Sequence, residues 1–203
     1  LVQDRLLDAL HQFRPRLVVP LDRALEDGDA VGKQRDVVGA PLRARRALVE
    51  AVKGGLAAAV GFAARLPPVV AAGQGGLLDV VLHPQFASNT LVYWSYSEAG
   101  NDGAGTAVAR GRLDGNRLAD VQVIFRQQPK VSGGNNHFGS RLVWSRDGKL
   151  FVGLGDRFTR KDDAQTLDNH MGKVVRIEAD GKVPADNPFA QRNGAKAEIW
   201  SYG

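Results

Sequence analysis

The stretch that decides the fold is Asn136-His137-Phe138-Gly139-Ser140-Arg141-Leu142-Val143-Trp144, followed shortly by Gly153-Leu154-Gly155-Asp156. Apolar runs within and between these segments predict two strands, at residues 141–145 and 150–154. The Arg146-Asp147-Gly148 turn between them predicts an antiparallel hairpin, because Asp-Gly supplies the positive φ that tight turns need. The two outer ends of such a hairpin lie at one rim of the sheet.

That rim carries a histidine and an aspartate. His137 comes just before the first predicted strand and Asp156 just after the second, so the two side chains are expected within hydrogen-bond reach. A carboxylate that binds an imidazole fixes its tautomer and stabilises its protonated form, which is how a general base is made. Each residue also has a simpler interpretation, since His137 could cap a turn beside Asn136 and Asp156 could satisfy turn N–H groups.

The second half of the chain has the composition of a β protein. Residues 67–203 hold all three Trp, all three Tyr and six of the eight Phe, and such residues favour strands. Short strands separated by Gly- and Asp-containing turns predict an all-β sandwich, barrel or propeller. The expected strands are residues 77–82, 91–97, 106–113, 121–125, 141–145, 150–154 and 173–178.

Residues 1–65 have a different composition, rich in Ala, Leu, Val, Arg and Asp. Residues 42–64 favour helix, but Gly54-Gly55 interrupts them, so we expect this segment to be helical in part at most and leave it unassigned. The tight Arg43, Arg45 and Arg46 cluster is interpreted as a solvated helix face.

Several function classes are disfavoured by composition. The net charge of +5 is scattered, and without a basic face we expect no nucleic-acid partner. The chain has no cysteine, which excludes disulfides and thiolate catalysis. The apolar run at residues 54–64 is too short to span a membrane. The N-terminus lacks both a signal-peptide pattern and an initiator Met, so we expect the chain to be a piece of a longer protein.

Several ordered motifs in residues 66–203 resemble one family, the soluble pyrroloquinoline quinone (PQQ)-dependent sugar dehydrogenases of the glucose/sorbosone dehydrogenase family, and in particular their aldose sugar dehydrogenases. Ordered runs of this length are a stronger signal than any single motif. The runs are Leu66-Pro67-Pro68-Val69, Gly73-Gln74-Gly75-Gly76-Leu77-Leu78-Asp79-Val80, His83-Pro84-Gln85-Phe86, Val123-Ile124-Phe125-Arg126-Gln127, residues 137–143, Gly155-Asp156, residues 167–177, residues 183–189 and Glu198-Ile199-Trp200-Ser201-Tyr202-Gly203.

The resemblance implies a six-bladed β-propeller that binds PQQ near its axis and oxidises the anomeric hydroxyl of aldoses to lactones, with electrons passed to an external acceptor. It implies that His137 is the base, that Asp156 is its carboxylate partner, and that Gln74 lies beside the quinone. It also implies a calcium ion at the quinone, with most ligands expected beyond residue 203, and a periplasmic or secreted location.

Two departures from the family pattern shape the expectation for this chain. Residues 1–65 do not resemble the first blade, and the basic residues that hold PQQ in the family are expected beyond residue 203. At roughly 40–50 residues per blade, residues 66–203 would form about three blades. We therefore expect a partial propeller with unpaired edge strands that is inactive, or nearly so, by itself.

Other candidate residues are interpreted structurally. His83 and His170 lack a paired metal-ligand spacing. Asp162, Asp163 and Asp168 do not have EF-hand spacing and are expected in a solvated acidic loop, and Arg141 is expected to pair with a carboxylate. Two other functions stay open: a non-catalytic propeller that binds carbohydrate or protein, and a metal-assisted lactone hydrolase.

Overall fold

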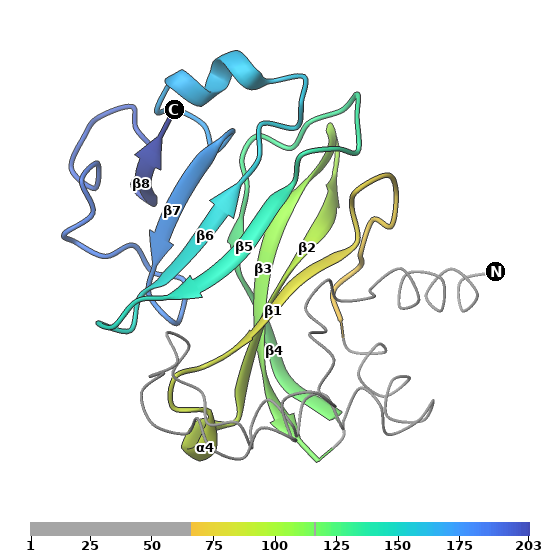
Figure 1. Cartoon of the computed structure of the whole chain (residues 1–203), viewed down its shortest axis with the longest axis vertical. Coiled ribbons are helices and arrows are strands. Elements are labelled where there is room, and N and C mark those ends of the chain that lie inside the picture. Colours follow the sequence, from red (N-terminus) through yellow and green to blue (C-terminus); the bar gives the residue numbers. More distant parts are fainter. Residues whose placement is uncertain (1–65, 116) are drawn as a thin grey trace, which may run out of the picture. The chain divides into compact units, whose positions relative to one another are not determined.

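The computed structural model describes residues 66–115 and 117–203, which are almost entirely strands and connections (Figure 1). The elements in chain order are β1 (Leu77–Leu82), α4 (Phe86–Asn89), β2 (Leu91–Gly100), β3 (Gly103–Asp114), β4 (Arg117–Arg126), β5 (Gly139–Trp144), β6 (Leu150–Leu154), the 3₁₀ helix η1 (Lys161–Gln165), β7 (Lys173–Ile177) and β8 (Ile199–Tyr202). The predicted all-β class is confirmed for the described residues.

The strands form two four-stranded sheets in which each strand pairs with its neighbour in the chain. The orders are β1-β2-β3-β4 and β5-β6-β7-β8, and every pairing is antiparallel. Four-stranded antiparallel sheets are the repeating unit of propellers. The expected count of about three blades is not confirmed, because long strands such as the 12-residue β3 and the long connection between β7 and β8 take up more sequence per sheet.

The turns form where the sequence predicts them. Asn101-Asp102-Gly103 joins β2 to β3, with Gly103 at φ 127°, and Gly115, at φ 57°, lies between β3 and β4. At the β5–β6 turn, Gly148 has φ 79° and the Ser145 N–H donates to the Lys149 carbonyl at 2.9 Å. The hairpin predicted there is therefore confirmed.

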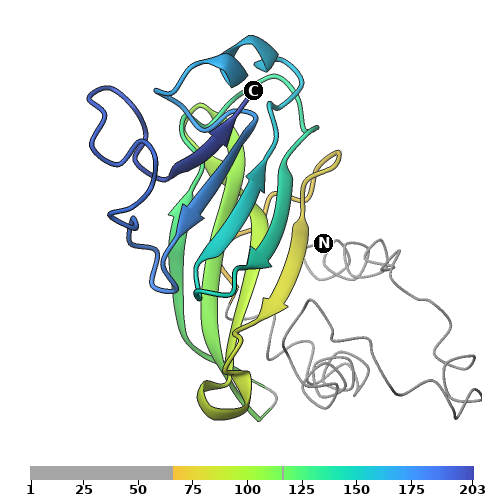
Figure 2. The same cartoon turned by 60° about the vertical axis from the view of Figure 1, so that its left-hand side comes forward.

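The two sheets pack face to face, as Figures 1 and 2 show from two directions. Strand β2 alternates between the two faces of its sheet: Tyr93 packs toward the second sheet, whereas Trp94 and Tyr96 belong to a cluster on the opposite face. The core between the sheets comprises Tyr93, Val108, Phe125, Leu142, Leu150, Val152, Leu154, Val175 and Ile177. This packing fixes the rim at which β5 begins and β6 ends.

The expectations for residues 1–65, including partial helix at 42–64 and the arginine cluster, lie outside the described residues. Within the described residues, no helix has the length and apolar character needed to cross a membrane.

Candidate active site

His137 and Asp156 meet at the rim where β5 begins and β6 ends. Gly139, the first residue of β5, pairs with Leu154, the last residue of β6, so the chain segments just beyond them stay adjacent. The His137 Nδ1 atom lies 2.9 Å from the Asp156 Oδ1 atom. The imidazole side chain is 47% exposed and the carboxylate 27%, so the pair is open on the histidine side. The structure thus brings together the two residues that the hairpin argument paired.

The backbone around His137 is held in an unusual conformation. His137 has φ 49° and Ser140 has φ 96°, in a region that non-glycine residues seldom occupy, and the β5–β6 register shifts between Gly139 and Leu142. Such irregularities re-aim side chains and gather at functional sites. The strand thus begins two residues earlier than the predicted Arg141, and its distorted start presents His137 at the rim.

Glycine at position 155 allows the two arms of the rim to approach closely. A Cβ atom at Gly155 would collide with the carbonyl group of His137, which is backbone and cannot swing aside. The Gly155 N–H donates to the Phe138 carbonyl at 3.2 Å, and the Arg157 N–H donates to the His137 carbonyl, also at 3.2 Å. Backbone hydrogen bonds therefore join the two segments at the residues immediately before and after Asp156.

The electrostatics of the pair fix the imidazole tautomer. The Phe158 N–H, 2.8 Å from Asp156 Oδ1, holds the pKa of the Asp156 carboxyl below its usual range; partial burial opposes this, and the hydrogen bond from His137 adds to it. An ionised carboxylate only accepts hydrogen bonds, so His137 Nδ1 must carry the proton. The Nε2 atom is then left with a lone pair, as a proton acceptor requires.

Gln74 contacts the backbone of His137, and Phe158 contacts its ring. The Gln74 Oε1 atom accepts the His137 backbone N–H at 2.9 Å, so the residue predicted beside the cofactor is bonded to the predicted base. The Phe158 ring, 65% exposed, meets the His137 ring edge-on with centroids 5.3 Å apart. Phe158 also has a positive φ of 65°. His137 is therefore held at its backbone by an amide side chain and bordered at its ring by an aromatic side chain.

Two buried polar residues, Gln127 and Thr106, bind the backbone of the rim. Gln127, fully buried, accepts the Thr106 N–H at 3.0 Å and donates to the Gly155 carbonyl at 3.0 Å. The Thr106 hydroxyl donates to the Phe138 carbonyl at 2.7 Å. These bonds tie strand β3 to the residue after His137 and to the residue before Asp156. Hydrogen bonds from the β1–β4 sheet and from Gln127, just after β4, thus fix the backbone on either side of the His137–Asp156 pair.

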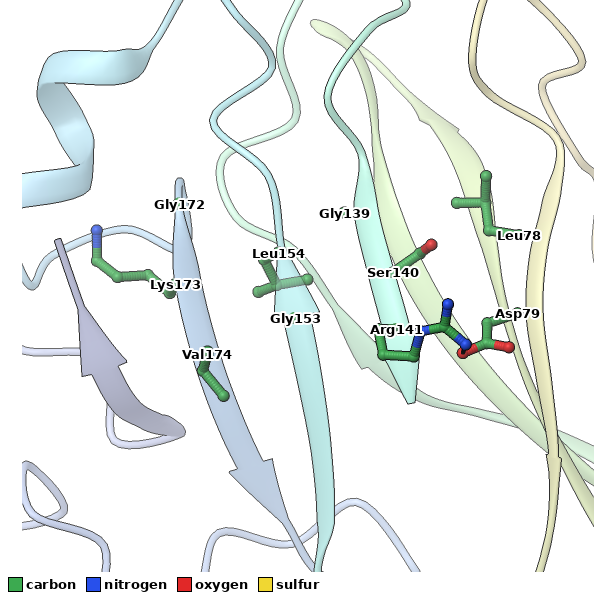
Figure 3. Close-up of a pocket in the computed structure, with 10 residues that line it drawn as sticks. All are labelled: Leu78, Asp79, Gly139, Ser140, Arg141, Gly153, Leu154, Gly172, Lys173 and Val174. Atoms are coloured by element: carbon green, nitrogen blue, oxygen red, sulfur yellow. Dashed lines mark ion pairs between the residues drawn. The ribbon is translucent and has the colours of Figure 1, made fainter. Parts of the chain in front are cut away.

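A shallow groove of about 480 Å³ lies beside the rim, along the exposed face of β5, β6 and β7 (Figure 3). Gly139, Gly153 and Gly172 line it, and Arg141 extends across it toward Asp79, with an Arg141 Nη1–Asp79 Oδ2 distance of 3.7 Å. The predicted pairing of Arg141 with a carboxylate is confirmed.

The other histidines have structural surroundings. His83 Nδ1 accepts the Gln85 N–H at 3.1 Å, and its ring stacks with Tyr93 at 6.0 Å. His170 is buried, and its Nδ1 atom accepts the Gln128 N–H at 3.0 Å. Both fit their structural interpretation.

The acidic segment is solvated at Asp162 and Asp168, as predicted, but it includes a short 3₁₀ helix. Asp162 and Asp163 lie in η1, where Asp163 pairs with Arg160, and Asp168 Oδ1 accepts the Thr166 hydroxyl at 2.7 Å. Among residues 66–115 and 117–203, no group of three or more His, Asp or Glu side chains is placed to hold a metal ion.

Sequence reasoning missed several supporting residues: Arg157, Thr106, Phe158 and Gln127. Nothing in the pattern separates a buried arginine after Asp156 from an exposed one. Gln127 did lie within one of the family-like runs, and a glutamine at the end of an apolar strand was the available signal.

The family model described as "Glucose / Sorbosone dehydrogenase" matches residues 42–203, and the chain belongs to this family. The matched range begins upstream of Leu66, where the quoted motifs start.

Individual relatives are consistent with this family. The chain is 53% identical over 141 residues to the aldose sugar dehydrogenase YliI of Escherichia coli, covering 68% of this chain and 38% of that protein. The apo structure of the soluble aldose sugar dehydrogenase of Escherichia coli matches with a TM-score of 0.65 at 51% identity, covering 68% and 40% of the two chains. The PQQ-bound aldose sugar dehydrogenase of Streptomyces coelicolor matches with a TM-score of 0.56 at 30% identity, covering 68% and 39%.

The chain spans about two fifths of the length of the relatives it matches. The two sheets are consistent with part of the propeller-like fold of the glucose dehydrogenases.

Proposed function

We propose that this chain supplies the proton-abstracting side of a PQQ-dependent aldose dehydrogenase, periplasmic or secreted, that oxidises the anomeric hydroxyl of an aldose to a lactone. The observation that carries the proposal is the His137 Nδ1–Asp156 Oδ1 contact of 2.9 Å at an exposed rim, in a chain of this family. The PQQ-bound relative supports the cofactor.

In this proposal His137 is the general base. With its Nδ1 proton held by Asp156, the Nε2 lone pair accepts the proton of the C1 hydroxyl as the C1–O bond gains double-bond character. Bound PQQ would supply the two-electron acceptor that takes the C1 hydrogen as hydride. The imidazolium formed is stabilised by the ionised Asp156, whose lowered pKa keeps it charged through the reaction. The proton later passes to solvent, to which the half-exposed ring is open.

Gln74 and Phe158 define the approach of the sugar. The Oε1 atom of Gln74 is used by the His137 N–H, which leaves its amide Nε2 to donate to a sugar or quinone oxygen. The exposed Phe158 ring offers an apolar surface to the C–H face of a pyranose beside the base. Both contacts would orient C1 toward His137.

The described residues fit the proton-transfer part of the site better than the cofactor-binding part. PQQ has three carboxylates that need positive partners. The Arg157 guanidinium, next to Asp156, and the Lys173 ammonium, next to Gly172, are both buried, and both donate to backbone carbonyls. We therefore assign neither to PQQ. We assign no calcium ligand among the described residues.

A segment exchange tests the proposal. Residues 66–203 would replace the matching segment of the Escherichia coli relative, and the chimera would be assayed for PQQ-dependent dye reduction with glucose and other aldoses. We expect activity that requires PQQ. A folded chimera that binds PQQ but reduces no dye with any aldose would contradict the proposal. Hydrolysis of lactones without PQQ would overturn it in favour of a hydrolase.

A further inference from the structure

Arg157 is the most unusual buried charge next to the site. We propose that Arg157 is a positioning residue that clamps the His137-bearing loop against Asp156, an inference that rests on the proposed function of this pair. Its side chain is 1% exposed, although it immediately follows Asp156 at the rim.

The guanidinium donates to backbone carbonyls. Nε donates to the Asn136 carbonyl at 3.1 Å, Nη1 to the Ala104 carbonyl at 3.0 Å, and Nη2 to the Gly134 carbonyl. A buried charge is costly unless it is well hydrogen-bonded, and apolar side chains could fill the same space without that cost. The positive charge of Arg157 is thus best explained by the backbone segments whose carbonyls it binds.

The groups that Arg157 contacts lie on both sides of His137 in the chain. Gly134 and Asn136 lie just before it, and the Phe138 ring just after it has its centroid 3.6 Å from the guanidinium carbon. The Arg157 backbone N–H donates to the His137 carbonyl at 3.2 Å. One residue, adjacent in sequence to Asp156, therefore contacts the positions before, at and after the base.

The same residue sets the hydrogen bond that Asp156 receives. Arg157 has φ 57°, a conformation that is unfavourable for a non-glycine residue and persists where the surroundings impose it. This left-handed turn directs the Phe158 N–H to Asp156 Oδ1. If the side-chain clamp is lost, the turn can relax to an ordinary conformation, and that N–H leaves the carboxylate.

A second buried arginine shows the contrast. Arg176, 4% exposed, binds the carboxylates of Asp186 and Asp147, at 2.9 Å and 3.0 Å. Its charge is neutralised by ion pairs away from the rim. Arg176 thus gives a matched control for the loss of a buried guanidinium without a change at the site.

The test is a carbon-13 NMR titration of the Asp156 carboxyl in the full chain, assigned with Asp156→Asn. The variants are Arg157→Met and Arg157→Lys, with Arg176→Met and Arg176→Lys as controls, and the melting temperature of each is recorded. We expect the Asp156 pKa to rise by roughly one unit in Arg157→Met, the order expected for loss of one backbone hydrogen bond, and to rise less in Arg157→Lys. The Arg176 variants should lose thermal stability but leave the Asp156 titration unchanged.

An unchanged Asp156 titration in a folded Arg157 variant, or an equal shift in an Arg176 variant, would overturn the inference. Should Arg157→Met fail to fold, Arg157→Lys, which keeps the charge and part of the bonding, decides the question in the same way. The readout needs neither PQQ nor turnover. A negative result here therefore leaves the proposed function standing, and a negative chimera assay leaves the clamp standing.

Discussion

Replacing Gln127 by Met should remove one of the connections between the two sheets beside the site while keeping the side-chain volume. The Gln127 side chain accepts the Thr106 N–H at 3.0 Å and donates to the carbonyls of Gly155 at 3.0 Å and His170 at 3.3 Å. A buried backbone group left without a partner costs about 1–3 kcal/mol, and the thioether replaces none of the three bonds well. A carbonyl can relax toward other donors more easily than an N–H can find an acceptor, and the Gly155 carbonyl is only partly buried. We therefore take about 1 kcal/mol for each carbonyl and about 1–3 kcal/mol for the N–H, a loss of about 3–5 kcal/mol.

The assay is urea unfolding of the full chain followed by circular dichroism, with the free energy taken by linear extrapolation. The matched control is Gln122→Met on β4, where the glutamine is exposed and bonds the Arg110 side chain. That surface change should alter stability by less than about 0.5 kcal/mol. If Gln127→Met costs less than about 1 kcal/mol, or no more than Gln122→Met, the reasoning about the buried node is wrong.

Two further predictions concern the rim. Because the pKa of Asp156 is lowered in the folded protein, its hydrogen bonds stabilise the fold at pH values above the ordinary Asp pKa of about 4. This stabilisation is lost as the pH falls through the lowered pKa of the folded state. The stability difference between wild type and Asp156→Asn, measured by urea unfolding, should thus be present at about pH 6 and shrink at lower pH; a constant difference would refute it. Gly155→Ala should destabilise the chain by more than about 1 kcal/mol in the same assay and separate His137 from Asp156, because its Cβ atom meets the His137 carbonyl, whereas Gly153→Ala, with no heavy atom nearer than 4.0 Å, should be far milder. Equal effects of the two alanines would count against the close approach.

Much of the β architecture was predictable because local signals determine it. The bounds of β1 and β6 match the predicted strands, and the Gly103 and Gly148 turns lie where positive φ was expected. Strand β8 was missed, because Ile199 is buried while the residues that follow it are exposed, so the segment lacks a clear alternation. The length taken by each sheet depends on long-range pairing, which explains why the blade count was not confirmed.

The site was partly predictable for the same reason. A hairpin brings its outer ends together, so the proximity of His137 and Asp156 followed from the positions of two strands and one turn. Gln74 entered only through family resemblance, since it is far from His137 in sequence. Arg157 and Thr106 act through backbone carbonyls, and side-chain-to-carbonyl bonds leave no periodic trace in a sequence.

The most direct test of the account is the turnover number of the chimera carrying His137→Gln, compared with the parent chimera and with His83→Gln as a histidine outside the site. The account predicts that His137→Gln lowers kcat by about 10²–10⁴-fold with PQQ affinity nearly unchanged, that Asp156→Asn lowers kcat by less, and that His83→Gln behaves like the parent. Near-normal turnover in the folded, PQQ-loaded His137→Gln chimera would contradict the assignment of His137 as the base.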